Sequence, residues 1–159
     1  MTTPSIPDPS GRPDDPAGTP SDDDAIALAH AMFDACRAGE GAGVLPLIDA
    51  GAPASMLDAD GNSLLMLAAY HGHADLVREL ARRGADVDAL NDRGQSPLAG
   101  AAFKGFDEVA SALLEAGADP EAGEPSGRAS AAFFGREAIA AMIRDAAPGA
   151  PDQDPGTSA

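Results

Sequence analysis

The sequence has a single cysteine, a single lysine and no apolar run of membrane-spanning length. Cys36 has no partner in the chain, so an internal disulfide is excluded. A membrane-spanning helix needs about 20 successive apolar residues, and no stretch approaches that length. The first residues carry neither a basic start nor an apolar run, so we expect no signal peptide. These absences favour a cytoplasmic protein.

Positive charge is scarce as well. The chain has 26 acidic and 10 basic residues, which gives a net charge of −16. Lys104 is the only lysine and the arginines are scattered, so no basic patch forms. An acidic surface repels nucleic-acid phosphates and anionic lipid head groups. We therefore expect neither nucleic acid nor a membrane as partner. The acidic charge either keeps the protein soluble or steers a basic partner.

Both ends of the chain are poor in the apolar residues that folding requires. Residues 1–24 hold six of the 14 prolines, six aspartates and no aromatic residue. Residues 147–159 hold three more prolines and two acids. Because neither segment offers enough apolar surface to offset the entropy of ordering it, both are predicted to be disordered acidic tails. The folded part is then expected to span residues 25–146.

Glycine, in contrast, is abundant and periodic. Three series recur every 33 residues: Gly51, Gly84 and Gly117; Gly39, Gly72 and Gly105; Gly61, Gly94 and Gly127. A period of this length indicates a solenoid of stacked supersecondary units. A solenoid exposes a long surface and usually has no catalytic cleft. The repeat therefore favours a binding protein.

Residues 58–90 show how one unit is built. Asp58–Gly61 is typical of a turn, and Ser63 is placed to cap a helix that runs to about His71. Gly72 ends that helix in the left-handed conformation. A second helix then starts, with an apolar face made of Leu76, Val77, Leu80 and Ala81. The next unit repeats this logic, with Ser96-Pro97 at the start of its first helix.

These residues carry a resemblance to a known family. The matching runs are Gly61–His73 with Gly84-Ala-Asp86, and Gly94–Leu98 with Ala101-Ala102, Gly105 and Gly117-Ala-Asp119. They resemble the ankyrin repeat, and small bacterial ankyrin proteins in particular, over about residues 25–145. The resemblance implies an all-α solenoid of antiparallel helix pairs with projecting hairpin loops, and protein–protein recognition as the function. Met66 and Ala99 depart from it, since ankyrin units usually place a histidine there.

The resemblance divides the folded part into four units: a capping repeat at 25–57, repeats at 58–90 and 91–123, and a truncated capping repeat at 124–146. Capped ends favour a monomer. In the first unit, the run Ser21–Asp24 is expected to start a helix that ends near Ala38 and turns Met32, Phe33 and Cys36 inward. Pro46 is expected to delay the second helix to Val44 or Leu45.

The last unit lacks three residues when Gly105 is aligned with Gly135. The missing segment matches Ser96-Pro97-Leu98, so we expect a short first helix there. The core of this unit is expected to be closed by Ile139, Met142 and Ile143.

Little in the sequence indicates catalysis, a cofactor or a metal. His71 and His73 are expected to brace loops, because no cysteine or third histidine lies nearby. Cys36 stands where the unit needs a small buried residue, so a structural role is expected. Asp22–Asp24 lack the glycine and glutamate of a calcium loop, and we expect them to start a helix instead.

In the family, partners usually meet the projecting loops and the exposed side of the first helices. Carried over residue by residue, this surface comprises Asp60, Asn62, Tyr70, His71, Leu90, Asp92, Arg93, Gln95, Phe103 and Lys104, and continues to Arg128, Phe133 and Phe134. Tyr70 and Phe103 are 33 residues apart and should lie side by side, either to anchor a partner or to cover the groove between repeats. The last two phenylalanines are expected to pack in the core of their short unit.

Three classes of function follow from this interpretation. The first is a non-enzymatic scaffold that binds one protein partner. The alternative is an acidic inhibitor or immunity-type protein that blocks a basic toxin or nuclease, and whose binding is weakened by salt. The third is an enzyme, for which Cys36 is the only candidate nucleophile.

Overall fold

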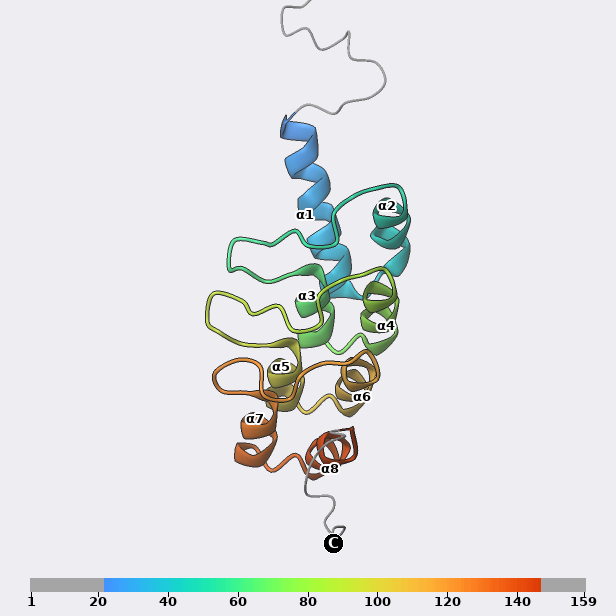
Figure 1. Ribbon diagram of the computed structural model, residues 1–159. Helices are drawn as coiled ribbons and strands as arrows, with labels where there is room; N and C mark the ends of the chain where they lie inside the picture. The colour runs from blue at the N-terminus through green and yellow to red at the C-terminus, as the bar shows by residue number, and fades with distance from the viewer. Residues whose placement is uncertain (1–21, 147–159) are drawn as a thin grey trace, which may run out of the picture.

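The computed structural model describes residues 22–146, which form helices stacked in pairs along one axis (Figure 1). The first helices of the pairs are α1 (Asp22–Ala38), α3 (Leu64–Tyr70), α5 (Pro97–Lys104) and α7 (Gly127–Phe133). The second helices are α2 (Leu45–Asp49), which follows the 3₁₀ turn η2 (Gly41–Gly43), then α4 (Ala74–Arg82), α6 (Asp107–Glu115) and α8 (Glu137–Ala146). Apart from the residues of α1, the two predicted disordered tails lie outside the described residues.

The helices form two layers, and the long loops project from one of them. Each first helix packs on the next first helix, and α4, α6 and α8 pack on one another in the same way. The loops extend from the layer of first helices, on the side away from the second layer (Figure 1). Within residues 22–146 no strand forms, and one isolated bridge pairs Leu57 with Ser63. The chain is therefore an all-α solenoid, as predicted.

Serine side chains start three of the first helices. The backbone amides of Met66, Ala99 and Ala129 donate to the hydroxyl oxygens of Ser63, Ser96 and Ser126 at 3.0, 3.0 and 3.1 Å. Each bond satisfies an amide that has no partner within the helix. The predicted caps at Ser63 and Ser96 are confirmed.

The cap at Ser126 corrects the expectation for the last unit. Ser126 does the work of Ser96, so the start of the helix is present and the three missing residues belong to the preceding loop. Helix α7 has seven residues, as many as α3, and it is not shortened. The predicted site of the deletion was therefore wrong.

The glycine at 127 does not belong to the series of Gly61 and Gly94. Those two glycines have φ angles of +77° and +73° in their turns, whereas Gly127 lies in α7 without a positive φ. A Cβ atom at Gly127 would lie 2.7 Å from Cγ of Leu98, which is closer than real atoms pack. Its glycine is required by helix packing, and the 33-residue spacing is coincidental there.

The core runs through the whole stack and follows the predicted faces. Among the residues named above as facing inward, those that are buried are Met32, Phe33, Cys36, Leu76, Val77, Leu80, Ile139 and Ile143, and Ala81 is partly buried. In the next unit the equivalent residues Val109, Ala110 and Leu113 are buried as well. Met142 packs against this core from its edge. The late start of the second helix after Val44 is also confirmed, because α2 begins at Leu45.

The two phenylalanines at the end of α7 lie outside this core. Phe133 is 82% exposed and Phe134 is 37% exposed. The prediction that they fill the core of the last unit was wrong, because Ala131, Ile139 and Ile143 already fill it.

One position in each repeat braces the repeat before it. The side chains of His73, Phe106 and Arg136 pack against Gly39, Gly72 and Gly105, the second glycine series. His73 Nε2 donates to the Arg37 carbonyl at 2.8 Å, and Arg136 donates to the Ala102 and Phe103 carbonyls, both at 2.8 Å. His73 therefore has the predicted bracing role, at the end of α1. Nδ1 of His71 lies 2.9 Å from the Leu67 carbonyl of its own helix, so the loop-bracing role predicted for His71 was wrong.

None of the helices in residues 22–146 combines the length and the apolar composition needed to cross a bilayer.

Candidate protein-binding surface

A carboxylate and an amide shape the projecting loops. Oδ1 of Asp58 accepts hydrogen bonds from the backbone amides of Asp60 and Asn62, both at 2.9 Å. One repeat later, Oδ1 of Asn91 accepts from the amides of Arg93 and Gln95 at 2.9 and 3.1 Å. Such side-chain bonds to amides two and four residues on fix the loop backbone. Both loops are therefore folded in the same way.

Adjacent loops are also joined to each other. Nδ2 of Asn91 donates to Oδ1 of Asn62 at 3.0 Å and to Oε1 of Gln95 at 3.2 Å. The Asp92 amide donates to the Asp60 carbonyl at 3.1 Å. Asn62 and Gln95 thus lie half-buried in a brace between the two loops. The side chains of Asp60, Asp92 and Arg93 are exposed at the tips.

The sequence interpretation missed Asn91, which holds the two loops of the candidate surface together. It is buried at the centre of the brace, and its side chain makes bonds in both loops. The signal was present, because Asn91 lies 33 residues after Asp58, in the same turn position.

Asp58 remains ionised at neutral pH. Burial of the Asp58 carboxylate opposes this, but the amide bonds from Asn62 and Asp60 and the Arg37 guanidinium outweigh it and lower the pKa. Arg37 Nη2 lies 3.3 Å from Oδ2 of Asp58. The carboxylate therefore links the first loop to the end of α1.

Asp58→Ala is expected to lower the free energy of unfolding by about 1–3 kcal/mol, because two loop amides lose a charged acceptor. Asp58→Asn, the residue found at position 91, keeps that acceptor and should lose less. The Asp58 pKa is depressed in the folded protein, so its stabilisation is present above the unfolded pKa of about 4 and is lost as pH falls further. Urea denaturation at pH 7 and pH 3 should show a smaller acid effect for Asp58→Asn. Equal stability of Asp58→Ala and the parent at pH 7 would contradict the role of the carboxylate.

Four aromatic side chains form a continuous row, which we call the aromatic row: Tyr70, Phe103, Phe134 and Phe133. The rings of Tyr70 and Phe103 are stacked, with centroids 6.3 Å apart and planes at 14°. Phe134 meets Phe103 edge to face at 5.1 Å, and Phe133 meets Phe134 in the same way at 4.9 Å. The predicted contact of Tyr70 and Phe103 is confirmed.

The row crosses three repeats at the ends of α3, α5 and α7. The Tyr70 ring packs on α5, and only its outer part reaches solvent. A Cβ atom at Gly100 of α5 would lie 3.0 Å from this ring. Phe103 is 42% exposed. Tyr70 therefore covers part of the groove between repeats, while the rest of the row is open to a partner.

A hollow of about 180 Å³ separates the first loop from the end of α3. Its lining includes Arg37, Asp60, Asn62, Tyr70, His71 and Arg93. Five of the predicted contact residues thus lie together around one depression. The other five are Leu90, Asp92 and Gln95 on the second loop, and Phe103 and Lys104 on α5. Further along, Arg128 forms an ion pair with Glu121.

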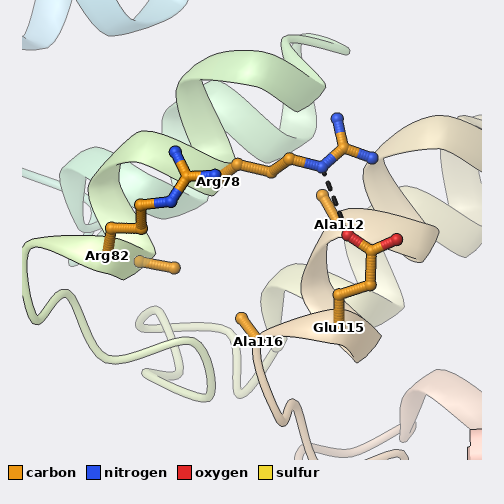
Figure 2. A pocket seen from close by; sticks show the side chains of 6 residues that line it. Arg78, Arg82, Ala112, Glu115 and Ala116 are labelled. Carbon is orange, nitrogen blue, oxygen red and sulfur yellow. Dashed lines mark hydrogen bonds and ion pairs between the residues drawn. The ribbon is translucent and has the colours of Figure 1, made fainter.

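A second hollow, of about 260 Å³, lies between α4 and α6 (Figure 2). Arg78 reaches across it, with Nε 3.3 Å from Oε1 of Glu115. Arg82 is paired with Glu79 on its own helix. Because both guanidinium groups are already paired with carboxylates, we assign this hollow to the joint between two repeats.

The lone thiol, Cys36, is fully buried in the core. Burial raises the pKa of Cys36 to about 12, against the opposing effect of the Arg37 charge. The side chain is therefore a neutral thiol at physiological pH, and only the thiolate is nucleophilic. The structural role predicted for Cys36 is confirmed. Across residues 22–146, no three His, Cys, Asp or Glu side chains are grouped so that they could hold a metal ion.

Known proteins share this repeat pattern. The sequence profile described as ankyrin repeats, three copies, matches residues 32–123, which is more than half of the chain. A Pseudomonas aeruginosa protein with a provisional ankyrin-repeat name is 45% identical over 51 residues. The aligned part is 32% of this chain and 30% of that relative's length.

Proposed function

The chain belongs to the ankyrin-repeat family, and we propose that it is a non-enzymatic module that binds a protein partner through its loop tips and aromatic row. Ankyrin repeats are protein–protein interaction modules. The proposed contact residues are Asp60, Asn62, Tyr70, His71, Leu90, Asp92, Arg93, Gln95, Phe103 and Lys104, and the exposed Phe133 and Phe134 complete the row. The observation that carries the proposal is the aromatic row, which presents large apolar side chains to solvent across three repeats. Contiguous exposed apolar patches mark interaction sites more often than they occur by accident.

The loops beside the row support the same function. Asp58 and Asn91 hold the loop backbones, and the brace through Asn62 joins them. A surface that is already ordered loses less conformational entropy when it binds. The tips and the row therefore form a preorganised surface with apolar anchors and polar groups at its edge.

The acidic tips favour a basic partner as a second candidate. The exposed carboxylates of Asp60 and Asp92 take part in no ion pair within residues 22–146. An inhibitor of a basic toxin or nuclease would use such charges to accelerate association. A partner retained in low salt and released at moderate ionic strength would support this alternative over the scaffold.

Replacing Tyr70 and Phe103 together by alanine is expected to weaken partner binding at least tenfold, because anchors of this kind dominate interface energies. The helical circular dichroism should be retained and the variant should stay folded at the assay temperature, although Tyr70 loses its packing on α5. The measurement is affinity capture from native lysate with the full chain as bait, followed by titration of the captured protein.

Ile26→Ala with Leu28→Ala is the matched control, because it truncates two exposed apolar side chains on the first turns of α1, away from the row. A partner kept by the parent and the control, and lost by the row variant, would support the proposal. Unchanged binding, or an unfolded row variant, would count against it.

A further inference from the structure

The charge along the aromatic row differs from that of the rest of the molecule. Six positions at the ends of three first helices make up this strip: Tyr70, His71, Phe103, Lys104, Phe133 and Phe134. None of them is acidic, although the chain has 26 acids, and one of them is its only lysine. The strip is therefore apolar with one permanent positive charge.

The Lys104 ammonium lies over aromatic rings and is not paired with a carboxylate. Its Nζ lies 4.7 Å from the ring centroid of Tyr70 and 5.7 Å from that of Phe106. Within residues 22–146 the ammonium group forms these two cation–π contacts and no ion pair. Most arginines of the same range are paired, namely Arg37, Arg78, Arg82, Arg83 and Arg128. Lys104 thus keeps its hydrogen-bonding capacity for a bound group.

Resting on the proposed function, we infer that the row receives an extended partner segment that carries bulky apolar side chains and, beside them, one carboxylate that pairs with Lys104. The apolar side chains cover the rings of Phe103, Phe133 and Phe134. A charge-assisted bond to an ammonium is stronger where neighbouring apolar groups exclude water. This bond fixes the register of the segment along the row.

The net charge of the chain further restricts the amino-acid composition of the bound segment. A net charge of −16 repels a strongly acidic segment, so the carboxylate is isolated among apolar residues. A lysine or arginine at the same point of the segment would face the like charge of Lys104. The chemistry recognised is therefore a mainly apolar peptide with a single aspartate or glutamate.

The test is a selection of a phage-displayed library of random 12-residue peptides on the full chain, on Lys104→Glu and on Phe103→Ala. The parent is expected to enrich peptides with bulky apolar residues next to one acid. Lys104→Glu should instead enrich peptides with lysine or arginine at that point, and Phe103→Ala should lose the enrichment. A synthetic copy of a selected peptide should bind Lys104→Gln about 5–10-fold more weakly by fluorescence anisotropy. When the acid of that peptide is replaced by the corresponding amide, the peptide should bind the parent and Lys104→Gln with equal affinity.

Several outcomes would overturn the inference. In the selection, the parent would enrich basic peptides, would enrich none, or would enrich the same peptides as Lys104→Glu. In sedimentation, the chain would form a dimer that Phe133→Ala dissociates. The last result would assign the row to a second copy of the chain. Capture of a partner that depends on Tyr70 and Phe103 but not on Lys104 would leave the proposed function standing and remove only this inference.

Discussion

Leu80→Ala is expected to lower the free energy of unfolding by about 2–5 kcal/mol, because it removes three buried carbon atoms and leaves a cavity. Leu80 is fully buried on α4, which packs against both α3 and α6. The loss is a large share of the about 5–15 kcal/mol that stabilises an ordinary domain. In a solenoid each repeat contacts only its neighbours, so a cavity in a central repeat weakens both joints.

The same substitution at an exposed leucine gives the control. Leu57 is 55% exposed, so Leu57→Ala should change the free energy of unfolding by less than about 0.5 kcal/mol. Urea denaturation followed by circular dichroism measures both variants. If Leu80→Ala proved as stable as Leu57→Ala, the assignment of the buried face of α4 would be wrong.

The regular repeats could be predicted from the sequence because their signals are local. A serine cap requires only a hydroxyl three residues before an amide, and Ser63 and Ser96 are placed for it. The face of α4 requires only helical spacing of apolar residues, and Leu76, Val77 and Leu80 show it. Neither signal depends on contacts with distant parts of the chain.

The last unit could not be predicted in the same way, because its features depend on contacts between units. Spacing alone cannot separate a glycine that needs a positive φ, such as Gly94, from one that needs room, such as Gly127 under Leu98. The exposure of Phe133 depends on what packs on α7, and apolar composition does not carry that information. The aligned Ser126 was the signal that would have placed the deletion in the loop.

In the candidate surface, too, features set by the repeat length could be predicted and features set by contacts between loops could not. The contact of Tyr70 with Phe103 follows from the repeat length, because equivalent residues of stacked units must be neighbours. The brace through Asn91 does not follow from the repeat length, because it depends on side-chain hydrogen bonds between two loops. The sequence thus indicates where the surface lies, and the structure shows which of its residues hold it together.

Gly39→Ala is expected to lower the free energy of unfolding by about 2–4 kcal/mol, for two separate reasons. The φ angle of Gly39 is +77°, which costs an alanine about 1–2 kcal/mol. The new Cβ would also lie 2.5 Å from Nδ1 of His73, so the ring would have to turn away. Turning it breaks the bond from Nε2 to the Arg37 carbonyl and loosens the joint between the first two repeats.

Gly135→Ala separates the two causes, because Gly135 has a φ of +66° and no atom within 4 Å of its added Cβ. It should therefore cost only the backbone strain, about 1–2 kcal/mol by urea denaturation. In a His73→Ala background the clash is absent, and the cost of Gly39→Ala should fall to the Gly135→Ala value. Equal costs of the two glycine substitutions in the parent would mean that backbone conformation alone requires glycine at position 39. A larger cost at Gly39 than at Gly135 would show that packing between repeats also requires glycine at position 39. The 33-residue period then specifies how the repeats stack, because it places glycine where a residue of the next repeat packs.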